Sequence, residues 1–188
     1  MEPLLQVKNL KKYFPTKSGM LHAVDNVSFT IEQGKTLGVV GESGCGKSTL
    51  GRVVLHLLPA TGEILFDGKD ISNPSKAELH DLRRNMQMVF QDPYSSINPR
   101  QSVAEIIGEP LKVYKICKTK EEYDARVKQL MEIVGLPERY EHSYPHELDG
   151  GRRQRIGIGR ALALQPKFIV CDEPVSALDV SIQAQILN

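Results

Sequence analysis

The chain has 188 residues, of which 25% are charged and 40% hydrophobic, and its formal net charge is +1 at pH 7. This length allows one domain with a substantial core. The near balance of charge gives no electrostatic argument for a nucleic-acid or membrane partner, and no apolar run approaches the roughly 20 residues that span a bilayer. The three cysteines, Cys45, Cys117 and Cys171, have no metal-ligand spacing and are typical of reduced cytosolic thiols.

Residues 4–40 are rich in patterns typical of β-structure. The stretch 24–31 alternates apolar and polar residues through much of its length, as a half-buried strand does. The apolar run 36–40, Thr-Leu-Gly-Val-Val, predicts another strand. Residues 63–68, Glu-Ile-Leu-Phe-Asp-Gly, predict a strand that enters a turn.

A phosphate-binding loop follows the apolar run 36–40, and a helix-like stretch, 50–58, comes after it. Glycines let such a loop turn tightly, so that backbone N–H groups and a helix N-terminus point at a phosphate. The alternative is a glycine-rich turn that only joins a strand to a helix. The lysine of the motif is expected to reach the β- and γ-phosphates of ATP, and the next hydroxyl to hold Mg²⁺. The loop fills the pattern G-x-x-x-x-G-K-[ST] with Gly41, Glu42, Ser43, Gly44, Cys45, Gly46, Lys47 and Ser48, and a second hydroxyl residue, Thr49, follows.

A short helix and a strand are predicted next. Ser75 and Glu78 form a capping box that opens a helix ending at about Arg84. Residues 86–90 predict a strand. Residues 92–100 contain two prolines, several serines and an asparagine, and predict a loop.

The following part of the chain has a helical pattern. Thr119 and Glu122 match a second capping box, and Gly135 is suited to end the helix. We therefore expect residues 92–165 to form a helical lobe inserted between strands. The apolar side chains that recur at helical spacing are Tyr123, Val127, Leu130 and Val134.

A continuous apolar run, residues 168–171, is typical of a parallel strand covered on both faces. It ends in Asp172 and Glu173. Asp172 is expected to bind Mg²⁺ and Glu173 to orient or deprotonate the attacking water. The alternative is a pair of solvated carboxylates, which the phosphate loop upstream disfavours. Residues 181–188 predict the beginning of a helix.

With these motifs the chain resembles the ATP-binding cassette ATPases over all 188 residues. Residues 41–49 match the first Walker motif and residues 168–173 the second. The resemblance implies an α/β fold: a P-loop NTPase core with a mostly parallel sheet and an N-terminal antiparallel β lobe, formed by residues 1–91 and 166–188, and an inserted helical lobe, 92–165, that carries the signature motif.

Further site residues follow from this resemblance alone. Gln91 matches the glutamine that touches Mg²⁺ and the attacking water and relays to the membrane partner; the alternative is an ordinary polar residue at a strand end. Phe14 stands where the family stacks an aromatic ring on adenine, with Tyr13 as a neighbouring candidate and a core role as the alternative. Asp179 belongs to the segment 176–179, which crosses the dimer interface in the family.

Within this family, the chain most resembles the ATPase subunits of oligopeptide and dipeptide importers. The subunits of nickel and glutathione importers look similar, so the cargo stays open. The resemblance implies a second ABC ATPase subunit, as a homodimer or heterodimer, two transmembrane permease subunits and, indirectly, a peptide-binding protein. The protein would be peripheral at the cytoplasmic face of the membrane and soluble when isolated. The segments that carry this match are 90–94, 98–100, 144–147 and 174–185.

The signature motif departs from the family. Where the family has Leu-Ser-Gly-Gly-Gln, this chain has Leu148, then Asp149, Gly150, Gly151 and Arg152. A carboxylate there repels the γ-phosphate held by a partner subunit, and Arg152 offsets part of that charge, so we expect a poor partner for ATP-dependent closure. The alternative role of Asp149 is helix N-capping.

Nucleic-acid binding by the neighbouring arginines is not expected, because a short basic run is usually a solvated helix face.

A second departure is the absence of the family's histidine downstream of the second Walker motif, so we expect a chain that is incomplete at its C-terminus. Two main functions follow: an ATPase subunit that powers peptide import, or a nucleotide-binding fragment without turnover. A third, a soluble cassette ATPase acting on nucleic acid or ribosomes, is disfavoured by the Gln91 region and the peptide-importer segments. Cys45 inside the loop is either a packing residue or a thiol whose modification blocks nucleotide binding.

Overall fold

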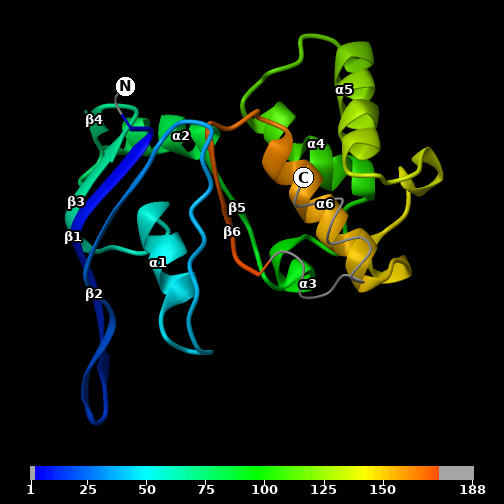
Figure 1. Ribbon diagram of the computed structural model, residues 1–188. Coiled ribbons are helices and arrows are strands. Elements are labelled where there is room, and N and C mark those ends of the chain that lie inside the picture. Colours follow the sequence, from blue (N-terminus) through cyan, green and yellow to red (C-terminus); the bar gives the residue numbers. More distant parts are fainter. Residues whose placement is uncertain (1–2, 174–188) are drawn as a thin grey trace. The chain divides into compact units, whose positions relative to one another are not determined.

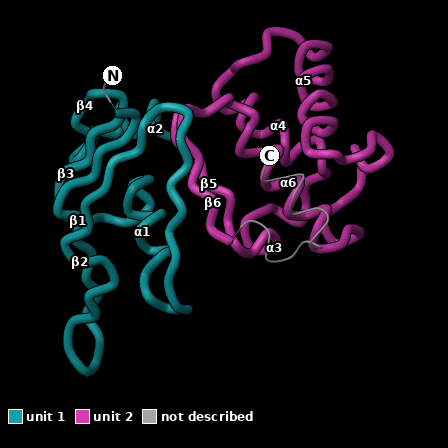
Figure 2. Tube along the Cα trace, in the orientation of Figure 1, with its two compact units in different colours: residues 1–83 teal, residues 84–188 magenta. Residues whose placement is uncertain are grey.

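The computed structural model describes residues 3–173 (Figure 1). The predictions for the helix at 181–188, for Asp179 and for the importer-like segment 174–185 therefore lie outside the described residues. The chain forms two compact units, Met1–Arg83 and Arg84–Asn188, drawn in teal and magenta in Figure 2. Among residues 3–173, no helix is both long enough and apolar enough to cross a membrane.

The first unit contains a four-stranded antiparallel sheet in the order β2-β1-β3-β4. Its central strand, β1, pairs Leu5 with Ile31 of β2 and with Phe66 of β3. Alternate side chains of these strands form the apolar core, among them the fully buried Leu5 and Val7. The elements of this unit are β1 (Leu5–Thr16), β2 (Gly19–Ile31), α1 (Lys47–Val54), β3 (Thr61–Phe66), β4 (Lys69–Asp70) and α2 (Lys76–Asn85), whose last residues pass into the second unit.

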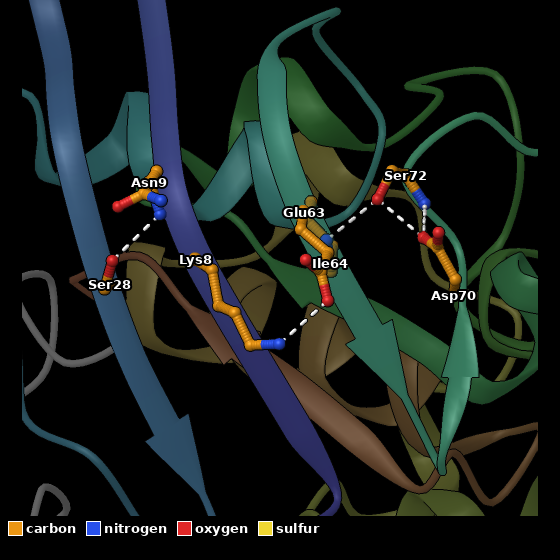
Figure 3. A network of polar contacts seen from close by, with 7 residues as sticks. All are labelled: Lys8, Asn9, Ser28, Glu63, Ile64, Asp70 and Ser72. Carbon is orange, nitrogen blue, oxygen red and sulfur yellow. Dashed lines mark hydrogen bonds and ion pairs between the residues drawn. The ribbon is translucent and has the colours of Figure 1, made fainter.

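Side-chain contacts link β1 to both of its neighbouring strands (Figure 3). The pairing of β1 with β2 shifts between Val7 and Leu10, and there the backbone N–H of Asn9 donates to the hydroxyl of Ser28 at 2.8 Å. Across the other side of β1, the Lys8 ammonium and the Glu63 carboxylate form an ion pair at 2.9 Å. The predictions of strands at 24–31 and 63–68 and of a capping box at Ser75 and Glu78 are confirmed.

The prediction of a strand at residues 36–40 is wrong for the described structure. These residues belong to no strand, and Val40 is 96% exposed, while Leu37 and Val39 are about half exposed. A strand exists only where its N–H and C=O groups pair with a neighbour, and no strand among residues 3–173 pairs with this segment. Apolar composition alone does not supply that neighbour.

The second unit combines a two-stranded parallel sheet with a helical layer. Strand β5 pairs with β6 in register from Met86 opposite Phe168 to Val89 opposite Cys171. The parallel strand predicted at 168–171 is confirmed, although its side chains are only partly buried and Cys171 is exposed. The elements are β5 (Met86–Val89), α3 (Pro93–Ser96), α4 (Val103–Val113), α5 (Lys120–Ile133), η1 (Glu138–Tyr140), η2 (Pro145–Glu147), α6 (Gly150–Leu162) and β6 (Phe168–Cys171).

Helices α4, α5 and α6 enclose the core of this unit, which includes Ile106, Leu130 and Ile156. The predicted helix at 119–135 is confirmed: Thr119 caps α5 by accepting from the N–H of Glu122 at 3.2 Å, and Gly135 ends it with φ of 66°. The reciprocal half of the predicted capping box is wrong, because the Glu122 carboxylate accepts from the N–H of Lys118 at 2.7 Å rather than from that of Thr119. The predicted loop at 92–100 contains one short helix, α3, because the Asp92 side chain caps it.

Candidate functional site

The loop of residues 41–49 lies in the first unit, and its glycines are required by its geometry. Gly44 and Gly46 have φ of 79° and 100°, a region that side chains disfavour. A Cβ on Gly46 would lie 2.0 Å from the carbonyl oxygen of Ala23 on β2. The loop therefore packs directly on the backbone of the sheet, and only glycine fits at that point.

The loop ends in a helix terminus suited to an anion. Helix α1 begins at Lys47, its cap residue Gly46 provides no side-chain hydrogen bond, and its first turn has no acidic residue. The partial positive charge of the helix end is therefore not neutralised by its own capping residue or first turn. The Lys47 ammonium donates to the carbonyl oxygens of Gly41 at 2.9 Å and Glu42 at 2.8 Å, so it is held over the loop that it is predicted to serve.

The sulfur of Cys45 faces the same part of the loop. Its Sγ lies 3.9 Å from Nζ of Lys47, and a Cβ on Gly41 would approach it to 2.6 Å. The side chain is exposed. A bulky group attached to this sulfur would therefore stand beside the lysine.

Two aromatic candidates on β1 have different surroundings. Phe14 is half-buried, pairs across the hairpin with Leu21, and has the Lys12 ammonium 4.8 Å from its ring centroid. The hydroxyl of Tyr13 donates to Asp25 at 2.5 Å, and its ring stacks on His22 at 3.9 Å. This hydrogen bond raises the pKa of Tyr13 and lowers that of Asp25. Because Tyr13 is engaged within the hairpin, Phe14 is the better candidate for stacking on a base.

The second unit holds the predicted carboxylates together with Gln91. Residue Asp172 is 7% exposed, and its N–H donates to the carbonyl of Val89 at 2.9 Å, which continues the parallel pairing past the strand end. Glu173 is exposed and has a positive φ of 46°. The side-chain amide of Gln91 donates to Oε2 of Glu173 at 2.6 Å. Two residues far apart in sequence, both predicted to handle the attacking water, are thus in direct contact.

Asp149 performs the N-capping role that was one of its two predicted roles. Its Oδ1 accepts from the N–H of Arg152 at 2.7 Å, and its other oxygen pairs with the Arg152 guanidinium. That guanidinium also lies 5.0 Å from the ring centroid of Tyr140. The capping and ion-pairing expectations for this motif are confirmed, whereas its effect on a nucleotide stays a prediction. Gly150 and Gly151 form the first turn of α6.

The arginines that follow are engaged within the second unit rather than forming a freely solvated basic face. Arg153 donates through Nε to the carbonyl of Pro145 at 2.8 Å, and Arg155 donates to the carbonyls of Val134 and Gly135 at the end of α5. Arg160 donates to the carbonyl of Ser96 at 2.6 Å, and burial lowers its pKa. These guanidinium groups therefore hold α6 to the segments around it.

One buried polar residue, Gln154, has no counterpart among the residues predicted from the sequence. It is 2% exposed, and its amide donates to the carbonyl of Phe90 at 3.4 Å. A glutamine one position beyond the arginine pair gives no signal of burial on its own, because glutamine is usually exposed on helices. The apolar residues around it, such as the fully buried Ile156, are the sequence feature that indicates a buried helix face.

Together, these features define a phosphate-binding loop protein with an acidic strand end. The ABC transporter family model matches residues 24–176, and the chain belongs to that family. It is 56% identical to the oligopeptide transport ATP-binding protein OppF of Bacillus subtilis (strain 168), over all of this chain and 62% of that protein. It is 51% identical to the dipeptide transport ATP-binding protein DppF of Lactococcus lactis subsp. cremoris (strain MG1363), over 98% of this chain and 61% of that protein.

Solved structures agree with this assignment. The dimeric post-hydrolysis structure of the ATP-binding cassette MJ0796 bound to ADP and Pi matches with a TM-score of 0.90 and 31% identity, over 97% of this chain and 79% of that one. The predicted α/β class with an antiparallel N-terminal sheet and a parallel sheet is confirmed. The chain spans about three fifths of the length of the two curated relatives.

Proposed function

We propose that this chain is an ATP-binding and ATP-hydrolysing subunit that energises the import of oligopeptides or dipeptides. The observation that carries the proposal is the loop of residues 41–49, where Gly46 lies against the backbone of β2 and the Lys47 ammonium is held over the loop at the start of α1. The names of the relatives support peptides as the cargo. The subunit would act at the cytoplasmic face of the membrane, with a second ATPase subunit, two permease subunits and a peptide-binding protein.

Separate groups of residues would bind ATP and activate the attacking water. The loop N–H groups and Lys47 bind the phosphates, while Phe14 stacks on the adenine. Glu173 accepts a proton from the attacking water, and the amide of Gln91 orients the Glu173 carboxylate through their 2.6 Å hydrogen bond.

Mg²⁺ prefers hard oxygen ligands, and each of the three residues proposed to hold it offers one. Ser48 offers a hydroxyl, Gln91 an amide oxygen and Asp172 a carboxylate. When bound, the ion would neutralise charge that develops on the phosphates.

A second candidate function is nucleotide binding without turnover. The Asp149–Arg152 pair favours it, since it puts a carboxylate where the family's signature has a serine. In this case the P-loop would still bind ATP, but hydrolysis would not follow.

A calorimetric titration with Mg·ATP tests the binding step. Binding by the unaltered chain, abolished by Lys47→Ala and unchanged by Lys35→Ala, an exposed lysine outside the loop, would support nucleotide binding. No binding by the unaltered chain would reject both candidates.

A phosphate-release assay then separates the two candidates. Turnover that Glu173→Gln removes while binding persists supports the ATPase. Binding without any turnover in the unaltered chain supports the second candidate instead.

A further inference from the structure

Helix α6 holds the segment that carries Gln91 at three points, all within the second unit. The amide of Gln154 donates to the carbonyl of Phe90 at 3.4 Å. The guanidinium of Arg153 lies 5.2 Å from the ring centroid of Tyr94, and Arg160 donates to the carbonyl of Ser96 at 2.6 Å. Residues 90–96 are therefore fixed to one helix from their first residue to their last.

Gln154 contributes a buried amide to these three contacts. Its side chain is 2% exposed, and its Oε1 makes no hydrogen bond within residues 3–173. A buried amide with an unsatisfied oxygen is unfavourable, and an apolar side chain of the same size would fill the space without that penalty. Packing alone therefore does not account for a glutamine at this position. What the amide provides is the contact with Phe90.

The contact with Phe90 lies one peptide bond from Gln91. Gln91 in turn donates to Glu173 at 2.6 Å, and α6 begins at the Asp149 cap, five residues before Gln154. A single helix thus connects the 149–152 turn to the Gln91–Glu173 pair. A displacement of that turn along α6 would move the backbone next to Gln91.

We propose that Gln154 is a positioning residue that transmits the position of α6 to the Gln91–Glu173 hydrogen bond. The side chain acts through Phe90 and Gln91 and itself touches no nucleotide. Its catalytic meaning depends on the ATPase function proposed above, whereas its structural effect on residues 90–96 does not.

Hydrogen exchange of the nucleotide-free chain tests the structural step without any need for turnover. Gln154→Met keeps the volume and removes the amide, so amide exchange in residues 90–96 should rise about fivefold, the effect of one hydrogen bond of typical net strength. Gln129→Met is the matched control, because Gln129 lies on α5 and accepts from Arg126 instead. Gln154→Leu provides a second apolar variant if Gln154→Met does not fold. Unchanged exchange in residues 90–96 would overturn the proposal.

Steady-state kinetics tests the catalytic step. Gln154→Met should lower kcat about fivefold with KM unchanged. In a Gln91→Ala background it should cause no further loss, because its effect passes through Gln91. Losses that multiply in the double variant would show a general structural defect and overturn the proposal. If the unaltered chain has no turnover, the ATPase function fails, and the exchange experiment alone decides on Gln154.

Discussion

At the scale of single residues, the loop of residues 41–49 provides its own chemical probe in Cys45. The thiol is exposed and lies 3.9 Å from Nζ of Lys47. A maleimide attached there would occupy the space beside the lysine. We therefore expect labelling of Cys45 to abolish nucleotide binding, and Mg·ATP to slow the labelling.

Cys117 is the internal control for this experiment. It is half-buried in the second unit, and burial raises the pKa of its thiol, so it should react slowly and at the same rate with or without nucleotide. The rates are measured by mass spectrometry of the two peptides. Equal labelling of Cys45 with and without ATP would contradict a nucleotide in the loop.

At the scale of the elements, the close approach of the loop to β2 predicts that a side chain at position 46 destabilises the fold. Gly46→Ala would place a Cβ 2.0 Å from the carbonyl oxygen of Ala23 at a φ of 100°. We expect the free energy of unfolding to fall by more than about 1 kcal/mol and nucleotide binding to be lost. Gly38→Ala is the matched control, since no atom lies within 4 Å of its added Cβ. Urea unfolding that is the same for both variants would show that the loop does not pack on Ala23.

An ion pair at the start of helix α2 predicts that the stability of the fold depends on pH. The Lys69 ammonium at 2.7 Å, followed by the backbone and hydroxyl of Ser75, lowers the pKa of Glu78 from 4.5 to about 2. A carboxyl whose pKa is lower in the folded state stabilises the fold above its unfolded pKa, and this contribution is lost as the pH falls toward about 2. The stability difference between the unaltered chain and Glu78→Gln should therefore shrink between about pH 4.5 and pH 2. If the urea midpoints of the unaltered chain and Glu78→Gln stay equally far apart across this range, the ion pair does not make the stability depend on pH.

The elements also show what the sequence could predict. Local signals were sufficient where a cap or a periodic face specifies the element, as at Ser75 with Glu78 and at Thr119 with Gly135. They failed at residues 36–40, because a strand depends on a neighbour that the local sequence does not contain. The contact of Gln91 with Glu173 and the burial of Gln154 both depend on residues more than 60 positions away, so no local pattern could reveal them.

At the scale of the whole molecule, the arginines of α6 are engaged in contacts within the second unit. Arg153, Arg155 and Arg160 donate to carbonyl groups. Arg152 instead forms an ion pair with Asp149. In the proposed assembly of two subunits around ATP, the altered signature at Asp149 is expected to weaken closure. A carboxylate ~4 Å from a phosphate charge repels it by roughly 4 kcal/mol at an effective dielectric constant of ~20. The Arg152 ion pair offsets part of this repulsion.

We accordingly predict that Asp149→Ser combined with Arg152→Gln increases ATP-dependent dimerisation, measured by analytical ultracentrifugation with a slowly hydrolysed ATP analogue. Asp149→Asn separates charge from capping, because asparagine caps a helix about as well as aspartate but carries no charge. If charge is the obstacle, Asp149→Asn should also increase the dimer fraction, and high salt should raise the dimer fraction of the unaltered chain by screening. If neither variant changes the dimer fraction, repulsion by Asp149 does not limit closure, and the aspartate serves only as the cap of α6 that the structure shows.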